Sequence, residues 1–222
     1  MSIQVASSAA DRLRITEIFF SLQGESRSVG WPTVFVRLTG CPLRCGYCDT
    51  AYAFQGGEWQ LLDEIVKRVA QYHARYVTVT GGEPLAQKDC VKLLTRLCDA
   101  GYEVSLETSG ALDISTVDPR VIRIMDIKTP GSGEEVKNRW ENIALLGAQD
   151  QVKFVICDRT DYDWAKKIIA RHALTDICEV LFSPVFGRLK PRDLADWILQ
   201  DQLPVRFQLQ LHKILWGDEP GR

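Results

Sequence analysis

The sequence has no long apolar segment and little histidine. No run approaches the ~20 apolar residues of a membrane-spanning helix, and the first residues, MSIQVASSAADRLR, lack the apolar core of a targeting signal. Only three histidines occur among the 222 residues, and the seven cysteines are an odd number that does not suit a disulfide framework. We therefore expect a cytoplasmic protein that does not enter a membrane.

No excess of either charge is present. Charged residues make up 25% of the chain, hydrophobic residues make up 45%, and the formal net charge is −2. This is the composition of an ordinary globular domain. Without a strong positive field, direct binding of a nucleic acid is not expected.

The cysteines divide into two groups. Cys90, Cys98, Cys157 and Cys178 stand singly in apolar patterns and are expected to be buried as small hydrophobic residues. The other three lie in TGCPLRCGYCDT, residues 39–50, with the spacing C-x3-C-x2-C.

A fourth ligand is missing from this motif. Closed zinc sites and closed iron–sulfur clusters take four protein ligands, and His73, His172 and His212 are remote in the sequence. Cys90 lies in a helical pattern, so it is a poor fourth ligand for a closed cluster. Three thiolates with one open coordination position are typical of a catalytic cluster.

Strand and helix patterns alternate along the chain. Apolar, β-branched runs predict strands at 33–38, 76–80, 102–107, 121–127, 152–157, 178–183 and 205–210, and amphipathic patterns predict helices at 61–73, 89–101, 161–172 and 191–200. Such alternation predicts a parallel α/β sheet. We expect one domain over residues 1–222, with a flexible arm at 1–12, folded as an open, partial barrel of about six β/α units.

Glycine-rich and polar segments follow the predicted strands. They are the cysteine loop, GGEP (81–84), ETSG (107–110), KTPGSG (128–133) and SPVFG (183–187). Because the carboxyl ends of parallel strands share one edge of a sheet, this edge is the predicted active site.

Two of these motifs resemble the radical S-adenosylmethionine (SAM) superfamily. The C-x3-C-x2-C loop follows the first predicted strand, and GGEP follows the second. The resemblance implies a [4Fe–4S] cluster held by Cys41, Cys45 and Cys48, SAM on the open iron, and a 5′-deoxyadenosyl radical that abstracts hydrogen from the substrate.

A closer resemblance comes from EIFFSLQGES (17–26), FVRLTGCPLRCGYCDT (35–50), ETSG and DIKTPGSG. These segments are similar to the 7-carboxy-7-deazaguanine synthase family, whose core is a truncated radical SAM barrel. The resemblance implies conversion of 6-carboxy-5,6,7,8-tetrahydropterin to 7-carboxy-7-deazaguanine with loss of ammonia, in the biosynthesis of queuosine and other 7-deazapurines. It also implies Mg2+, a homodimer, and flavodoxin or ferredoxin as the reductant.

The family pattern implies roles for individual residues. The substrate set is Leu22, Gln23, Gly24 and Thr80, the nucleotide set is Tyr47, Gly82, Glu107, Ser109, Asp126, Ile127 and Lys128, and the Mg2+ ligand is Thr50. Ser26 stands where the family usually has glycine. Gln208, Gln210 and His212 are expected near the pterin site, and no general acid or base is identified.

Arg37 is a charged residue inside an apolar predicted strand. A buried arginine needs an anionic partner, and the substrate carboxylate suits a guanidinium through two hydrogen bonds. The alternative is a structural ion pair with a residue of a neighbouring strand.

Two other functions fit parts of the pattern. A glycyl-radical-enzyme activase shares the cluster motif but would not explain the LQGE segment or Thr50. A non-enzymatic iron–sulfur carrier or a zinc-binding module would need a fourth ligand. Addition of SAM to the reduced cluster separates these classes, because only a cluster with an open iron changes its EPR spectrum.

Overall fold

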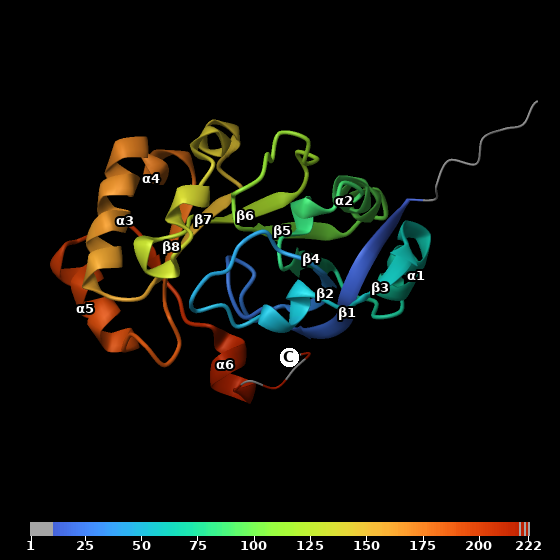
Figure 1. Cartoon of the computed structure of the whole chain (residues 1–222), viewed down its shortest axis with the longest axis horizontal. Coiled ribbons are helices and arrows are strands. Elements are labelled where there is room, and N and C mark those ends of the chain that lie inside the picture. Colours follow the sequence, from blue (N-terminus) through green and yellow to red (C-terminus); the bar gives the residue numbers. More distant parts are fainter. Residues whose placement is uncertain (1–10, 218, 220, 222) are drawn as a thin grey trace, which may run out of the picture.

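A computed structural model describes residues 11–217, 219 and 221 of the chain. Its strands form a single nine-stranded sheet in the order β3-β1-β2-β4-β5-β6-β7-β8-β9 (Figure 1). The strands are β1 (Arg12–Leu22), β2 (Pro32–Leu38), β3 (Glu58–Leu61), β4 (Tyr76–Gly81), β5 (Glu103–Thr108), β6 (Ile122–Asp126), β7 (Gln151–Ile156), β8 (Glu179–Pro184) and β9 (Arg206–Phe207).

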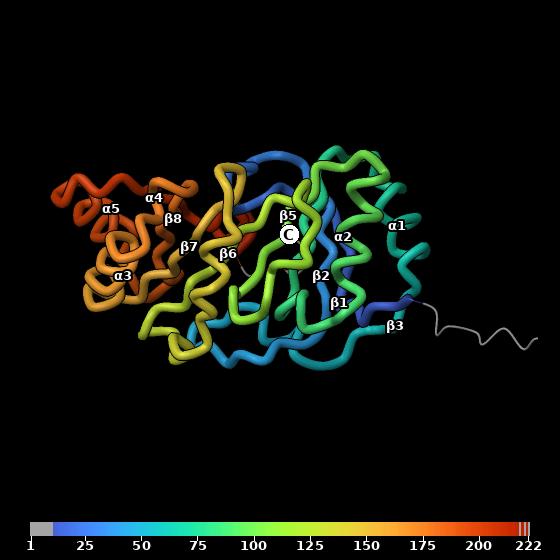
Figure 2. Tube along the Cα trace, turned by 90° about the horizontal axis from the view of Figure 1, so that it is seen from above, coloured from blue at the N-terminus to red at the C-terminus, as the bar shows by residue number. Residues whose placement is uncertain are grey.

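Helices connect the strands. The α-helices are α1 (Leu62–Ala70), α2 (Cys90–Asp99), α3 (Arg159–His172), α4 (Leu174–Ile177), α5 (Pro191–Gln200) and α6 (Leu211–Trp216). Short 3-10 helices are η1 (Ala51–Phe54), η2 (Pro84–Ala86), η3 (Pro130–Ser132), η4 (Glu135–Lys137) and η5 (Trp140–Leu145). Figure 2 shows α1 and α2 at one end of the long axis and α3, α4 and α5 at the other.

The sheet is parallel from β2 to β9, and β1 and β3 are antiparallel additions at one edge. Strands β3 and β9 are the two ends of the order, so the described sheet is open. The expected open, partial parallel barrel is therefore confirmed. The carboxyl ends of the parallel strands lie together along one edge, as such a barrel requires.

One continuous hydrophobic core lies between the sheet and the longer helices. It contains the apolar faces of α1, α2, α3 and α5 together with inward residues of the strands. Cys90, Cys157 and Cys178 are buried within the protein, as predicted for single cysteines in apolar patterns. Cys98 is half-buried and packs against the same core.

The sequence patterns missed two strands and two short α-helices, namely β1, β3, α4 and α6. The alternation of β1 is broken because the register shifts between Ile15 and Glu17, which is the sign of a β-bulge. Strand β3 is a four-residue edge strand with Trp59 and Leu61 exposed, and α6 is too short for a helical period. Strand β9 covers only two residues of the predicted 205–210.

The predicted arm of residues 1–12 lies mostly outside the described residues. Its last residue, Arg12, already belongs to β1 and is paired with Leu61. The described residues contain no helix long and apolar enough to cross a membrane.

Candidate active site

A cavity of about 590 Å³ opens at the carboxyl ends of the parallel strands. Of the sixteen residues to which the sequence gave site roles, fifteen line it, namely Leu22, Gln23, Gly24, Arg37, Cys41, Cys45, Tyr47, Cys48, Thr50, Thr80, Gly82, Glu107, Ser109, Asp126 and Lys128. Of the three residues expected near the pterin site, Gln210 and His212 also line the cavity, whereas Gln208 does not and instead accepts a hydrogen bond from the Ser26 N–H. The fold thus brings residues from 22 to 212 around one space.

Ile127 is the exception. Its side chain is 3% exposed and packs in the hydrophobic core, and its backbone N–H donates to the Lys153 carbonyl at 2.9 Å. Along β6 the side chains alternate between the two faces, so Asp126 and Lys128 reach the cavity and Ile127 does not. Ile127 therefore contributes to the placement of its neighbours.

The cysteine loop is held by backbone contacts from several elements. The Gly46 N–H donates to the Ser132 carbonyl at 2.9 Å, and the Arg44 N–H donates to the Glu134 carboxylate at 2.6 Å. Within the loop, the Leu43 N–H points to the Cys41 sulfur at 3.4 Å. Such contacts fix the loop and place a hydrogen-bond donor on one sulfur, as is common around iron–sulfur clusters.

The three thiols suit a cluster better than a single metal ion. No group of three histidine, cysteine or acidic side chains converges on one metal position among the described residues. Ligands of one zinc ion would have to converge in that way, whereas in a cubane cluster each thiolate holds a different iron. Three cysteines around one cavity therefore fit a [4Fe–4S] cluster.

Burial affects the charge of these thiols. Desolvation raises the pKa of Cys41, and it raises the pKa of Cys45 to about 11, with the Lys128 ammonium opposing both shifts. In the metal-free protein the thiols of Cys41 and Cys45 are therefore neutral near pH 7, and binding of iron releases their protons.

The GGEP segment joins the cysteine loop to β5. The Glu83 N–H donates to the Gly40 carbonyl at 2.8 Å, and the Glu83 side chain is fully buried. Its carboxylate accepts hydrogen bonds from Thr108 Oγ1 at 2.9 Å, from Ser109 Oγ at 2.5 Å and from the Ser109 N–H at 2.7 Å. Glu83 thus ties the ends of β4 and β5 together, and it uses the donor of the predicted nucleotide ligand Ser109.

Gly82 allows the cysteine loop to approach β4. A Cβ atom at this position would lie 2.2 Å from the Gly40 carbonyl oxygen and 2.7 Å from Cys41 Cβ. Both distances are shorter than van der Waals contact, so no other residue fits without a shift of the loop.

The loop after β1 is anchored to the opposite end of the sheet. The Ser26 N–H donates to Gln208 Oε1 at 2.9 Å, the Arg27 N–H donates to Gln151 Oε1 at 3.0 Å, and the Gly24 carbonyl accepts from the Leu211 N–H at 2.9 Å. Ser26 has a φ of +67°, the left-handed conformation that glycine adopts most easily. The serine therefore keeps the backbone conformation expected of the family glycine.

Arg37 has the alternative partner that the sequence left open. Its Nε lies 2.7 Å from Glu17 Oε1, and these residues are paired across β1 and β2. Glu17 also accepts from the Tyr52 hydroxyl at 2.8 Å. The guanidinium nevertheless lines the cavity, so the ion pair and a role in substrate binding are compatible.

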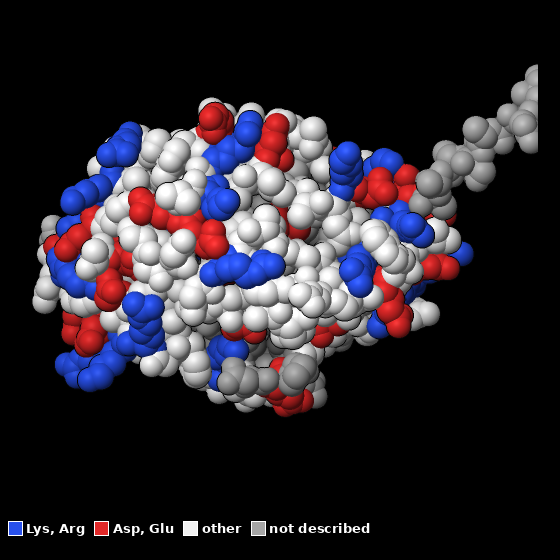
Figure 3. Space-filling model, in the orientation of Figure 1, with Lys and Arg blue, Asp and Glu red and all other residues white. Residues whose placement is uncertain are grey.

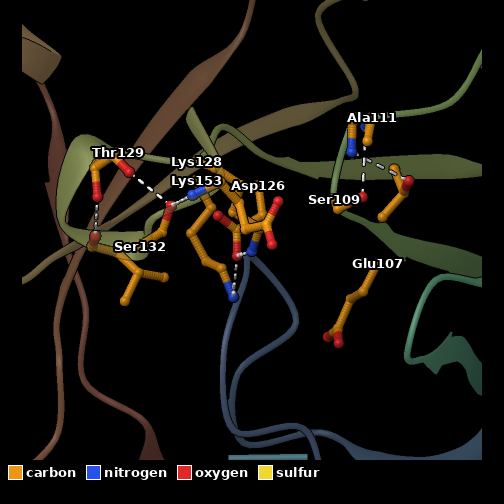
Figure 4. Close-up of polar contacts among 12 residues, drawn as sticks. Glu107, Ser109, Ala111, Asp126, Lys128, Thr129, Ser132 and Lys153 are labelled. Carbon is orange, nitrogen blue, oxygen red and sulfur yellow. Dashed lines mark hydrogen bonds and ion pairs between the residues drawn. The ribbon is translucent and has the colours of Figure 1, made fainter. Parts of the chain in front are cut away.

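Glu107 lies among the predicted substrate residues. Its carboxylate accepts from Thr80 Oγ1 at 2.9 Å and from Gln23 Nε2 at 3.3 Å. Burial raises the pKa of Glu107, and the charge of Lys153 offsets this only in part. Figure 4 shows this side chain apart from the group formed by Asp126, Lys128 and Lys153.

A chain of buried charges runs along the other side of the cavity. Lys153 Nζ lies 2.6 Å from Glu25 Oε2 and 3.8 Å from Asp126 Oδ2, and Lys128 Nζ lies 3.0 Å from Asp126 Oδ2. Burial acts to raise the pKa of Glu25, but Lys153, with smaller contributions from Gln210 and His212, outweighs it and the pKa lies below its usual value.

The sequence reasoning gave no role to Lys153 or Glu25. Lys153 stands in the apolar strand QVKFVI, which is the same signal that identified Arg37. Glu25 belongs to the LQGE segment, in which the family pattern gives roles to Leu22, Gln23 and Gly24.

The surface around these elements carries both charges. On the face drawn in Figure 3, lysine and arginine lie beside acidic residues at both ends and along the upper rim, and much of the centre is uncharged. This distribution agrees with a small-molecule site inside the protein.

Comparison with known proteins places this geometry in a family. The model of the radical SAM superfamily matches residues 35–171. The 7-carboxy-7-deazaguanine synthase of Chlorobaculum tepidum is 50% identical over 210 residues, covering 93% of this chain and 96% of the relative. The enzyme of the same name from Koribacter versatilis is 43% identical over 222 residues, covering 93% and 98%.

Solved structures agree on the fold. QueE from Escherichia coli superposes with a TM-score of 0.74 at 22% identity, covering 90% of this chain and 95% of that chain. SuiB from Streptococcus suis, bound to S-adenosylmethionine, gives a TM-score of 0.53 at 14% identity, covering 77% and 45%. With its cysteine motif, its cavity and near full-length relatives of one name, the chain belongs to the 7-carboxy-7-deazaguanine synthase family of the radical SAM superfamily.

Proposed function

We propose that this protein converts 6-carboxy-5,6,7,8-tetrahydropterin to 7-carboxy-7-deazaguanine with loss of ammonia. The observation that supports this most directly is the cavity, where fifteen residues expected from the family pattern meet around one space of about 590 Å³. That volume is in the range of sites for small ligands and cofactors. The glycyl-radical activase, the electron carrier and the zinc module receive no support from the relatives.

The cofactors are a [4Fe–4S] cluster held by Cys41, Cys45 and Cys48, and SAM. When bound, they supply a one-electron cleavage that gives a carbon radical able to take hydrogen from the substrate. The protein residues then bind, orient and shield the reactants. The nucleotide residues are proposed to be Tyr47, Gly82, Glu107, Ser109, Asp126, Ile127 and Lys128, with Ile127 acting only through its backbone.

We assign the substrate to the side of the cavity formed by Leu22, Gln23, Gly24, Arg37 and Thr80. Gln23 donates to Thr78 Oγ1 at 3.1 Å and to Glu107, so its amide is fixed in orientation. Burial lowers the pKa of His212, which favours a neutral imidazole beside Gly24. Uncharged donors and acceptors of this kind suit the edge of a pterin ring.

Mg2+ is proposed at Thr50. The Thr50 hydroxyl donates its hydrogen to Asp49 Oδ1 at 2.8 Å, so the lone pairs of its oxygen are left for a cation. A magnesium ion with one or two protein oxygens, substrate oxygens and water suits the hydration preference of this ion. The metal would neutralise charge that develops on the substrate.

We also propose a homodimer in the cytoplasm, reduced by a flavodoxin or a ferredoxin. Apolar side chains of Phe20 and Trp31 are 41% and 54% exposed near the ends of β1 and β2, which supports burial against a second subunit. Sedimentation at several concentrations tests the dimer.

One anaerobic assay tests the reaction. The reconstituted protein is mixed with reductant, SAM, Mg2+ and the tetrahydropterin, and products are identified by mass spectrometry. The expected result is 7-carboxy-7-deazaguanine with SAM recovered intact. Formation of 5′-deoxyadenosine without the deazapurine would retain the radical chemistry and reject the substrate, and neither product from a fully loaded cluster would reject both.

A further inference from the structure

Lys153 is the only residue in the described part of the cavity that forms ion pairs to both proposed halves of the site. Glu25, 2.6 Å from its ammonium group, lies in the loop that carries Gln23 and Gly24. Asp126, at 3.8 Å, lies at the end of β6 among the proposed nucleotide residues. The side chains of Lys153 and Glu25 are each 13% exposed, and that of Asp126 is 16% exposed.

We propose that Lys153 is a positioning residue that fixes the Glu25 carboxylate of the substrate loop relative to Asp126 at the end of the nucleotide strand. This inference goes beyond the proposed function in assigning a role to a residue outside the substrate and nucleotide sets, and it rests on that function for the identity of the pterin.

The backbone of Lys153 is set independently of its side chain. In the β6–β7 register Lys153 is the Cα partner of Asp126, and its carbonyl accepts from the Ile127 N–H at 2.9 Å. The Lys153 side chain therefore extends from a fixed point in the sheet. From there it spans to a loop that is 128 residues distant in sequence.

The loop has other anchors. Ser26, Arg27 and Gly24 are tied through backbone groups to Gln208, Gln151 and Leu211. Removal of the Lys153 charge therefore leaves the loop backbone attached. What changes is the Glu25 side chain, which would become a buried carboxylate without a cation.

Asp126 has one carboxylate oxygen with an unused acceptor. Its Oδ2 contacts Lys128 and Lys153, whereas its buried Oδ1 has no hydrogen-bond partner among the described residues. A buried oxygen of this kind is costly unless a ligand or water donates to it. The two lysines thus hold one oxygen of Asp126, while the other receives no hydrogen bond from the described residues.

Lys153→Met tests the proposal on the cluster-loaded full chain. It removes the charge at nearly constant length, whereas Lys153→Arg keeps the charge. Binding of SAM and of 6-carboxypterin, an aromatic probe that is not turned over, is measured together with the ratio of 5′-deoxyadenosine to deazapurine formed. Arg123→Met is the matched control, because it breaks a buried ion pair with Asp150 at 2.6 Å outside the cavity.

Lys153→Met is expected to weaken the binding of both SAM and 6-carboxypterin by about tenfold or more, as for loss of one partner of a buried charge pair. It is also expected to raise the ratio of 5′-deoxyadenosine to deazapurine. Lys153→Arg should retain most of the binding. The double variant Lys153→Met/Glu25→Gln should bind 6-carboxypterin no more weakly than Lys153→Met, because the two groups act as a unit. Arg123→Met should lower the melting temperature and leave the product ratio unchanged.

Wild-type binding and an unchanged ratio in Lys153→Met would overturn the proposal, and so would the same change of ratio in Arg123→Met. If Lys153→Met does not load a cluster, Glu25→Gln breaks the same pair from the other side and must raise the ratio. If the wild-type protein binds SAM but binds neither the pterin nor the deazapurine product, the proposed function is wrong. In that case an unchanged SAM affinity of Lys153→Met would separately overturn the positioning role of Lys153.

Discussion

Gly82→Ala should remove the iron–sulfur cluster while leaving most of the fold intact. The added Cβ would stand 2.2 Å from the Gly40 carbonyl oxygen and 2.7 Å from Cys41 Cβ. Neither neighbour is the flexible end of a side chain, so the loop that carries Cys41 must move. The segment cannot move away easily, because its backbone is hydrogen-bonded at both residues: the Gly82 N–H donates to the Leu38 carbonyl and the Glu83 N–H donates to the Gly40 carbonyl.

The size of the effect follows from the displacement. Relief of a contact at 2.2 Å needs a shift on the order of 1 Å, and overpacking of this kind costs about 1–3 kcal/mol of stability. Cluster ligation tolerates far less, because metal–ligand distances are set within about 0.2 Å. We therefore expect a modest fall in the melting temperature of the apoprotein and a severe loss of bound iron.

The assay is iron and acid-labile sulfide per chain after anaerobic reconstitution, with SAM affinity measured on any loaded fraction. Gly46→Ala is the matched control, since it lies between two cluster cysteines but its Cβ would meet only the Ser132 carbonyl oxygen at 4.0 Å. Full iron content and normal SAM affinity in Gly82→Ala would refute the steric reasoning. An equal loss in Gly46→Ala would show that any added methyl group disturbs the loop.

Three further predictions concern single side chains. Arg37→Ala should raise the KM for the pterin by about tenfold or more. Glu17→Gln breaks the ion pair but keeps the guanidinium, so it should change the KM little. Equal changes of KM in the two variants would show that the role of Arg37 is purely structural. Glu107→Gln should raise the melting temperature near neutral pH and lose this advantage in acid. The reason is that the pKa of Glu107 is raised in the folded state. The contribution of Glu107 to stability is therefore present below the pKa of the unfolded state and is lost as the pH rises through the pKa of the folded state. A difference in melting temperature that does not change with pH would contradict this prediction. Thr50→Val should leave SAM cleavage intact and reduce the activation by Mg2+, and an unchanged response to the metal would remove Thr50 from the site.

The parallel part of the fold could be predicted because its strands are buried and follow one another in sequence. Apolar runs such as VKFVI and amphipathic helices such as 191–200 carry strong periodic signals. The antiparallel edge could not be predicted, since a bulge after Ile15 hides the alternation of β1 and β3 has only four residues. Edge strands with exposed side chains have little periodicity to detect.

Most of the site residues could be predicted from the position of their segments at the ends of the predicted strands. The cysteine loop, GGEP and ETSG are local motifs, and the parallel topology brings them together. The role of Glu83 was not predicted, because it depends on the contact with Ser109 from the next strand. The same holds for Glu25, whose partner lies in β7, since no local pattern encodes a pair of that separation.

The distribution of charge partners separates the carboxylates of the cavity by role. Glu25 and Asp126 each have a lysine partner and serve as fixed acceptors, and the pKa of Glu25 is held below its usual value. Among the described residues Glu107 accepts hydrogen bonds from the hydroxyl of Thr80 and the amide of Gln23, and its raised pKa favours a proton on the carboxyl group. A neutral carboxyl group can donate as well as accept. Its two partners, Thr80 and Gln23, belong to the substrate set, so Glu107 lies both where the pterin is proposed to bind and beside the nucleotide residues. A proton held on Glu107 would therefore be available to the pterin or to the nucleotide.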